Sequence, residues 1–284
     1  MLRVKPLLAG LAAIAAVIGL LLAALWLVQP RLVYYPDLGG RSVERTPADI
    51  GLEHEAVRLQ TADGVSITGW YVPGAAAGAP VVLFLHGNAG NIGDRLDSLG
   101  QLHRAGAAVL IIDYRGFGAS GGRPSEHGTY EDARAAWSWL IDTRGVAPRR
   151  VVLFGRSLGA AVAARLARET RPAGVILEAA FTSLPDLAGD LYPWLPARWL
   201  TRYRYDTQRH LRAIDCPVLI AHAPGDEIVP FAHARRLAAI RPPVVDLVEL
   251  RGGHNDAFVV SAPEYTRTLA GFLERVTADS GDDR

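Results

Sequence analysis

The sequence has 284 residues, of which 50% are hydrophobic and 21% are charged, with a formal net charge of +1 at pH 7. This length and apolar content are typical of a globular protein with a sizeable core. The scattered, nearly balanced charge excludes the basic footprint of a nucleic-acid-binding protein.

The one cysteine, Cys216, excludes an internal disulfide. It precedes the apolar run 217–220, so we expect it to be buried in the core. The sequence contains no Cys/His cluster at metal-ligand spacing and no phosphate-binding or dinucleotide-binding loop. It therefore predicts neither a metal nor a cofactor, and it leaves the oligomeric state open.

Residues 7–28 form an uninterrupted apolar run near the N-terminus. As a helix this run is about 33 Å long, enough to cross a bilayer. It is longer than the apolar core of a secretory signal peptide, and no small-x-small cleavage site follows it. An uncleaved membrane anchor over residues 1–30 is therefore favoured over a removed signal peptide. A buried helix of the domain is disfavoured because the run precedes the fold.

The charges that flank this run predict its orientation. Arg3 and Lys5 precede it, whereas Arg31 and Asp37 follow it. The positive-inside rule then predicts a single-pass protein with a cytoplasmic N-terminus and an extracytoplasmic domain. The aromatic residues at the end of the run can belong to the membrane interface or, for the two tyrosines, pack on the domain: Trp26, Tyr34 and Tyr35.

After residue 50 the pattern alternates between short β-rich runs and longer helical stretches, which predicts a mostly parallel α/β sheet with flanking helices. Segments 56–60 and 65–72 read as an antiparallel hairpin around Asp63-Gly64. Continuous apolar runs predict buried strands at 81–85, 107–112, 151–154, 175–177, 218–221 and 244–250. Helices are expected at 94–105, 129–143, 158–169, 231–240 and 256–275.

This alternation indicates one domain over residues 45–276, preceded by a linker at 31–44 and followed by a polar tail at 277–284. Segment 179–214 breaks the rhythm, because it is too long for an ordinary connection. It is rich in Trp, Tyr and Pro. It predicts either a small cap that supplies a wall for an acyl group or an insertion with a minor core of its own.

The pentapeptide Gly155-Arg156-Ser157-Leu158-Gly159 follows a predicted strand and opens an Ala-rich helix. A serine on such a sharp turn is exposed to substrate and within reach of a base, and the turn admits only small neighbours. Because a serine hydroxyl needs a base to become a nucleophile, Ser157 in this setting is a candidate nucleophile.

An oxyanion formed by attack on a carbonyl requires preorganised donors. We expect one from the backbone N–H of Leu158 and the second from the loop 86–91, where the N–H of Asn88 is the candidate. His86 begins that loop, and we expect it to be a structural hydrogen-bonding group.

The base and the acid are expected in the chain order Ser, Asp, His. His254 follows the last predicted strand, and Asp226 follows the strand that ends near His222. Competing acids are Glu227, Asp256 and Glu178. The other histidines are expected to be surface or structural groups: His54, His103, His127, His210, His222 and His233.

Five motifs occur in one order between residues 50 and 275: HGNAGN, DYRGFGASGG with the following Pro-Ser-Glu, GRSLG, GDEIVP and GGHND. With Tyr34-Tyr35-Pro36, this set resembles the membrane-anchored α/β-hydrolase-domain proteins, which include monoacylglycerol-lipase-like and acyl-protein-thioesterase-like members. The resemblance implies an α/β-hydrolase fold, esterase activity on acyl chains, a Ser157–Asp226–His254 triad and no cofactor. A family loop with Asp113, Arg115, Gly116, Gly118 and Ser120 is expected to be structural.

The leading hypothesis is hydrolysis of an ester or thioester with an apolar acyl group through an acyl-enzyme on Ser157, so that the expected partners are a small acyl ester or lipid and the membrane. A serine peptidase is the second hypothesis, because related folds cleave peptides with the same triad. A non-catalytic binding protein is the third, and it is disfavoured because each catalytic position holds a competent residue.

Overall fold

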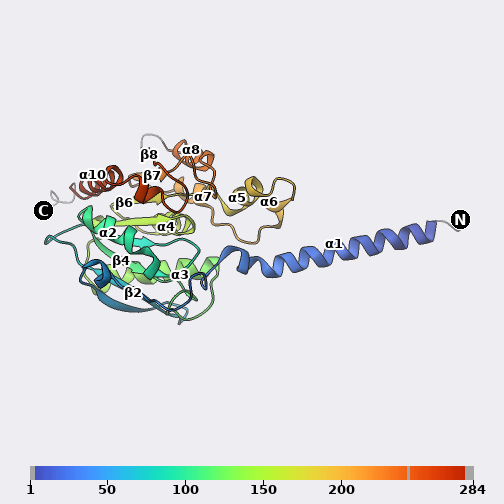
Figure 1. Ribbon diagram of the computed structural model, residues 1–284, viewed down its shortest axis with the longest axis horizontal. Coiled ribbons are helices and arrows are strands. Elements are labelled where there is room, and N and C mark those ends of the chain that lie inside the picture. Colours follow the sequence, from blue (N-terminus) through green and yellow to red (C-terminus); the bar gives the residue numbers. More distant parts are fainter. Residues whose placement is uncertain (1–3, 242–243, 279–284) are drawn as a thin grey trace.

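The computed structural model describes residues 4–241 and 244–278, and within them the strands form one eight-stranded sheet (Figure 1). The strand order is β1-β2-β4-β3-β5-β6-β7-β8, with β1 and β2 antiparallel to their neighbours and the other pairs parallel. The strands are β1 Glu55–Gln60, β2 Ser66–Val72, β3 Val81–Leu85, β4 Ala108–Ile112, β5 Val151–Arg156, β6 Gly174–Glu178, β7 Val218–His222 and β8 Val245–Glu249.

The five central parallel strands β4, β3, β5, β6 and β7 are buried along their whole length, because helices cover both faces of the sheet. Helices α3, α4 and α8 contribute apolar residues to the core on one face, and α2 and α10 contribute to the core on the other. These helices are α2 Leu96–Arg104, α3 Glu126–Ser138, α4 Leu158–Glu169, α8 Ala232–Ala238 and α10 Glu264–Ala278.

The predicted fold class is confirmed: the chain is an α/β protein with a mostly parallel sheet and flanking helices. The expected helix 256–275 is instead two helices, α9 Ala257–Val260 and α10. Pro263 lies between them and has no N–H to continue a helix. Cys216 is half-buried and packs against the core. Of the predicted polar tail, residues 279–284 lie outside the described part of the chain.

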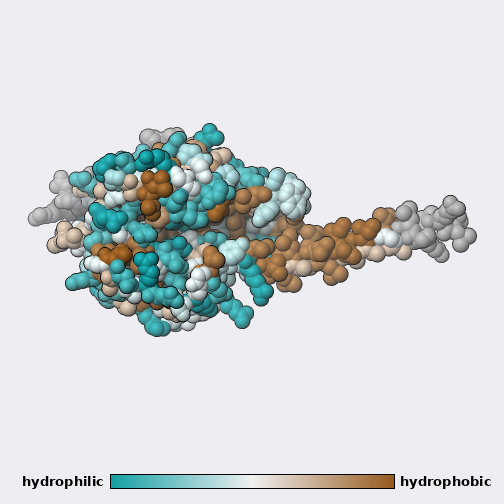
Figure 2. Space-filling view, viewed as in Figure 1, coloured by the Kyte–Doolittle hydropathy of each residue, from teal (hydrophilic) through white to brown (hydrophobic). Residues whose placement is uncertain are grey.

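Helix α1, Val4–Val33, extends away from the domain, and its apolar surface is exposed (Figures 1 and 2). Its segment Leu8–Val33 is long and apolar enough to cross a membrane. The helix continues past the apolar run because its last turn contacts the domain. Gln29 is only 8% exposed there, and Tyr34 directly after the helix is only 4% exposed. Tyr34 therefore packs on the domain.

The segment 179–214 carries three short helices: α5 Leu184–Leu191, α6 Ala197–Leu200 and α7 Thr207–Leu211. It leaves the sheet at the end of β6, and α5 and α6 lie on the side of the domain from which α1 extends (Figure 1). Three of its aromatic side chains point to solvent: Tyr192, Trp194 and Trp199 are 51%, 76% and 89% exposed. These rings do not form a minor core.

Candidate active site

A sharp turn between β5 and α4 carries Ser157. The backbone of this serine is in the positive-φ region, at φ 53° and ψ −117°, which is strained for a residue with a side chain. A Cβ on Gly155 would lie 2.3 Å from the Gly159 carbonyl oxygen, and one on Gly159 would lie 2.0 Å from that of Leu85. Only glycine fits at either position, so the two glycines allow the turn that presents the serine.

Three residues from separate loops meet at this turn. His254 Nε2 lies 3.2 Å from Ser157 Oγ, and His254 Nδ1 lies 2.7 Å from Asp226 Oδ2. Asp226 follows β7 and His254 follows β8, so both loops open at the carboxyl edge of the sheet, where β5 ends. The arrangement can pass a proton from the hydroxyl to the imidazole, while the carboxylate accepts from the other ring nitrogen.

Asp226 is held as a carboxylate by several donors. Its Oδ1 accepts from the backbone N–H groups of Ile228 and Val229, at 2.9 and 2.7 Å. Burial by itself would raise the pKa of this carboxyl. Hydrogen bonds from His222 and His254 outweigh burial and hold the pKa of Asp226 well below its usual range.

His222 also contacts Asp226, a contact that was not predicted from the sequence. Its Nε2 donates to the Val229 carbonyl at 2.9 Å and lies 3.3 Å from Asp226 Oδ2. The ring is buried, in agreement with the structural role expected for it. Its spacing of four residues from Asp226 was the available signal.

The competing acids lie nearby in other contacts. Glu227 accepts from the backbone N–H of His254 at 3.0 Å, and Asp256 accepts from that of Gly253 at 2.7 Å. Glu178 pairs with Arg156 Nε at 3.2 Å. Among the candidates, the carboxylate beside the imidazole is that of Asp226.

Arg156, directly before the serine, connects two parts of the site. Its buried side chain donates to the backbone carbonyls of His254 and Asn255, at 3.1 and 3.0 Å. The carbonyl of its ion-pair partner Glu178 accepts from the Ser157 N–H at 2.8 Å. This arginine therefore ties the serine turn to the histidine loop.

The loop that follows β3 lies against the serine. A Cβ on Gly87 would lie 3.7 Å from Ser157 Cβ. His86 Nδ1 donates to the Gly87 carbonyl at 2.7 Å. Because the peptide is planar and trans, the N–H of Asn88 points the opposite way from that carbonyl. Leu158 begins α4, and its N–H belongs to the helix N-terminus, where backbone donors have no intrahelical acceptor.

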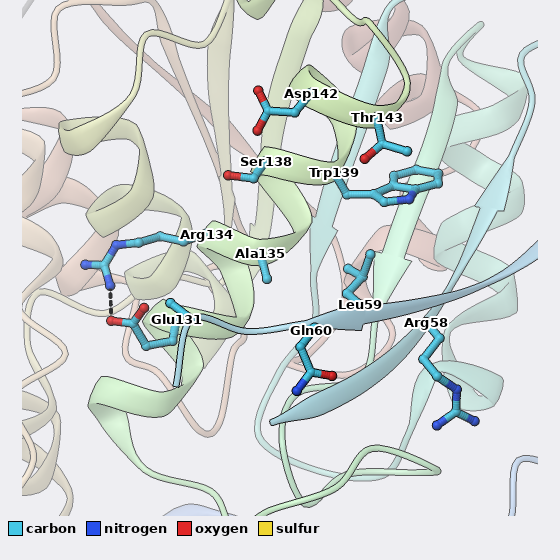
Figure 3. A pocket seen from close by; sticks show the side chains of 11 residues that line it. Arg58, Leu59, Gln60, Glu131, Arg134, Ala135, Ser138, Trp139, Asp142 and Thr143 are labelled. Carbon is cyan, nitrogen blue, oxygen red and sulfur yellow. Dashed lines mark hydrogen bonds and ion pairs between the residues drawn. The ribbon is translucent and has the colours of Figure 1, made fainter. Parts of the chain in front are cut away.

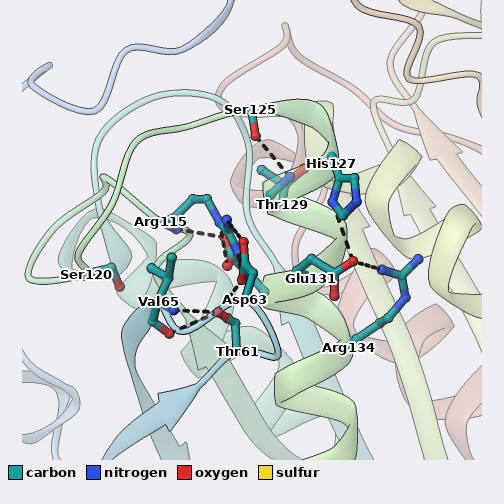
Figure 4. A network of polar contacts seen from close by, with 12 residues as sticks. Thr61, Asp63, Val65, Arg115, Ser120, Ser125, His127, Thr129, Glu131 and Arg134 are labelled. Carbon is teal, nitrogen blue, oxygen red and sulfur yellow. Dashed lines mark hydrogen bonds and ion pairs between the residues drawn. The ribbon is translucent and has the colours of Figure 1, made fainter.

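The loop from Asp113 to Ser120 is tied to its neighbours by ion pairs and hydrogen bonds. Arg115 binds Asp63 through both terminal nitrogens, at 2.6 and 2.9 Å (Figure 4). Its Nε donates to Asp132 on α3 at 2.9 Å. Ser120 Oγ donates to the Asp113 carbonyl at 2.8 Å. These contacts join the β1–β2 turn, the loop and α3.

A surface groove of 560 Å³ lies between β1 and α3 and is lined by residues such as Leu59, Glu131 and Trp139 (Figure 3). It is at the β1 end of the sheet, whereas Asp226 and His254 follow β7 and β8 at the other end. The groove contains none of the residues that meet at Ser157.

Comparison with known proteins places the chain in a family. Residues 77–206 match the Hydrolase_4 model, described as "Serine aminopeptidase, S33". An uncharacterized protein of Mycobacterium tuberculosis is 39% identical over 247 residues, which are 86% of this chain and 87% of that protein. The α/β-hydrolase domain-containing protein WAV2 of Arabidopsis thaliana is 35% identical over 87% of this chain and 88% of its own length. The chain belongs to the α/β-hydrolase family.

Other comparisons agree with this assignment. The rat lysophosphatidylserine lipase ABHD12 is 31% identical over 86% of this chain and 71% of its own length. An esterase from Pyrococcus furiosus has the same fold, with a TM-score of 0.73 and 22% identity over 86% of this chain and 97% of that one. The family resemblance predicted from the motifs is therefore confirmed, and the protein is a hydrolase of α/β-hydrolase fold.

Proposed function

We propose that the protein is a serine hydrolase that cleaves a carboxylic ester or thioester with an apolar acyl group. The observation that carries the proposal is the chain of two short contacts, 3.2 Å from Ser157 to His254 and 2.7 Å from His254 to Asp226, at a strained strand-to-helix turn. The name of one relative, the rat lysophosphatidylserine lipase, supports ester hydrolysis in general.

In this mechanism Ser157 Oγ attacks the acyl carbon while His254 Nε2 takes the hydroxyl proton. The oxyanion of the tetrahedral intermediate accepts from the N–H groups of Leu158 and Asn88. The intermediate collapses, the carbon–oxygen or carbon–sulfur bond breaks, and His254 returns the proton to the leaving group. Water then attacks the acyl-enzyme with the same base and releases the acid. Asp226 orients the imidazole and stabilises its protonated form.

The proposal includes attachment to a membrane through α1. The exposed apolar helix has the length that a bilayer requires, and a single-pass topology with a cytoplasmic N-terminus follows from Arg3 and Lys5. This location favours a lipid or another acyl ester that partitions into the bilayer. The rat relative, a lysophosphatidylserine lipase by name, supports a substrate of the same class.

We call the segment 179–214 the cap, and it contacts the C-terminal end of α1. Gln29 donates to the Leu200 carbonyl at 2.8 Å and accepts from the Arg202 N–H at 2.7 Å. The Arg202 guanidinium lies 4.4 Å from the centre of the Trp26 ring. Trp26 lies in the last turns of the apolar run, and Trp is favoured at membrane interfaces, so these contacts support a position of α6 near the membrane surface. In that position the exposed Trp199 is available for contact with lipid.

The experiment that tests the proposal compares Ser157→Ala with Ser138→Ala, a change at an exposed serine on α3. The full chain in detergent micelles is treated with a fluorophosphonate probe and assayed with p-nitrophenyl esters from short to long acyl chains. Ser157→Ala should abolish labelling and turnover, and Ser138→Ala should retain both. Labelling of Ser157→Ala at the wild-type level would overturn the assignment.

The matching family model carries the description of a peptidase, which favours peptide hydrolysis as the second candidate. The same triad cleaves both bonds, so the assay includes a peptide panel beside the esters and thioesters. Hydrolysis of peptides with no ester turnover would replace the first proposal with the second.

A further inference from the structure

Backbone and side-chain hydrogen bonds join the loop that follows β3 to the segment where α1 ends. The Tyr35 N–H donates to the Asn88 carbonyl at 2.8 Å, and the Gly90 N–H donates to the Tyr35 carbonyl at 3.1 Å. The Asn88 side-chain amide donates to the Val33 carbonyl at 2.8 Å. We call residues 33–35 the junction. It pairs with Asn88 and its neighbours as a short parallel bridge.

These bonds hold the two peptide groups on either side of Asn88. The peptide that contains the Asn88 N–H is held from one side, because His86 binds its carbonyl, that of Gly87. The peptide that follows Asn88 is held from the other side, because Tyr35 binds the Asn88 carbonyl. The direction of the Asn88 N–H is therefore set by one bond from within the domain and by bonds from the junction.

The junction itself is fixed to the domain. Tyr34 is buried, and its hydroxyl lies 2.8 Å from that of Tyr205. The Tyr205 hydroxyl lies 3.0 Å from Thr129 Oγ1 on α3. The ring of Tyr34 also contacts that of Tyr203 edge to face, with centroids 5.4 Å apart. A segment anchored in this way can support a neighbouring loop.

The loop needs such support. Gly87 and Gly90 flank Asn88 closely, and Gly90 is at φ 67°. Glycines widen the range of conformations open to a loop. An oxyanion donor is effective only when its direction is set before the charge develops.

We propose that the junction is a positioning element of the oxyanion hole, so that turnover requires residues 33–35 to be bound to the loop that follows β3. The proposal rests on the proposed function, because it takes the Asn88 N–H as the second donor. Asn88 has two roles in it: its backbone N–H touches the oxyanion, and its side chain positions that N–H by binding the junction.

The test replaces Asn88 by Ala, which keeps the backbone N–H and removes the bond to the Val33 carbonyl. The full chain in detergent micelles is assayed with p-nitrophenyl acetate, and active sites are counted by fluorophosphonate titration. We expect kcat per titrated site to fall about 10- to 100-fold, as for a misplaced catalytic group. KM should change little, and affinity for a trifluoromethyl ketone, which mimics the tetrahedral intermediate, should fall in parallel with kcat.

Gln29→Ala is the matched control. It also removes a side-chain amide that ties the end of α1 to the domain, but to the cap and not to the oxyanion loop. It should keep kcat per titrated site within about twofold, since no donor is displaced. An equal loss in Gln29→Ala would overturn the proposal, as would an unchanged kcat per site in Asn88→Ala. A merely structural role of Asn88 would lower the number of titratable sites and leave the kcat of each unchanged.

The outcomes also separate this inference from the proposed function. Absence of ester turnover and probe labelling in the wild-type chain would refute the serine-hydrolase proposal. Wild-type turnover with a fully active Asn88→Ala variant would refute only the role of the junction.

Discussion

His222 and His254 both approach the same oxygen, Oδ2 of Asp226, at 3.3 and 2.7 Å. His222 has the Val229 carbonyl as its other partner, so that its Nε2 carries the proton that faces the carboxylate. The charge on Asp226 therefore depends on His222, which lies four positions before it in the chain.

This contact predicts the effect of His222→Leu. Without the donor, the pKa of Asp226 should rise from its depressed level. As pH is lowered, the variant should therefore lose activity before the wild-type chain does. At neutral pH we expect kcat to fall about tenfold, which corresponds to one hydrogen bond to a charged group. The pH profile of kcat checks this, with His222→Gln as the variant that keeps a donor. Superimposable acid limbs would contradict it.

Gly159, in the turn that carries Ser157, predicts a contrast with a second glycine that also lies in a helix. In Gly159→Ala the added methyl meets the Leu85 backbone, so we expect a loss of about 3 kcal/mol or more in the free energy of unfolding and loss of probe labelling. Gly271→Ala on α10 meets nothing within 4 Å. It should stabilise the chain by about 0.5–1 kcal/mol, as Ala does in exposed helices. Denaturant unfolding measures both, and equal effects would rule out the steric explanation.

Asp113 predicts a dependence of stability on pH. Burial raises the pKa of Asp113 to about 7, so that between pH ~4 and ~7 the folded chain holds a proton that the unfolded chain has released. Stability should therefore fall as pH rises through this window, by at most about 1.4 kcal/mol per pH unit.

Asp113→Asn removes this titration and keeps an oxygen to accept the Ile92 N–H, which binds at 3.0 Å. Urea unfolding at several pH values should show the variant gaining on the wild-type chain as pH rises. A constant difference across the window would contradict the assignment.

The exposed rings of the cap predict a dependence on how the substrate is presented. The double variant Trp194→Ala/Trp199→Ala should lose about tenfold in turnover of a long-chain ester embedded in nanodiscs, because it loses apolar contact with the lipid surface. Turnover of soluble p-nitrophenyl acetate by the same preparation should be unchanged and serves as the control. Equal losses on both esters would indicate a role inside the domain.

The sequence predicted the sheet well, because its central strands are continuous apolar runs that only burial on both faces explains. It also placed Ser157, Asp226 and His254 in the order that brings their loops to one edge of a parallel sheet. Pro263 signals the interruption between α9 and α10, because a proline has no N–H to continue a helix. The contact of His222 with Asp226 is signalled locally by their spacing of four residues. The contacts of the junction depend on how segments distant in the chain meet, and local pattern carries no such information.

The burial of Tyr34 and Gln29 has a practical consequence for the preparation of a soluble enzyme. Removal of the first 36 residues deletes the apolar helix but also strips the partners of Asn88 and the cap. Such a truncated chain could keep the strand order and the Ser157–His254 contact and still turn over esters slowly. Its low activity would then be mistaken for the absence of an enzyme. A truncation that begins before Gln29 keeps these contacts and is the better choice.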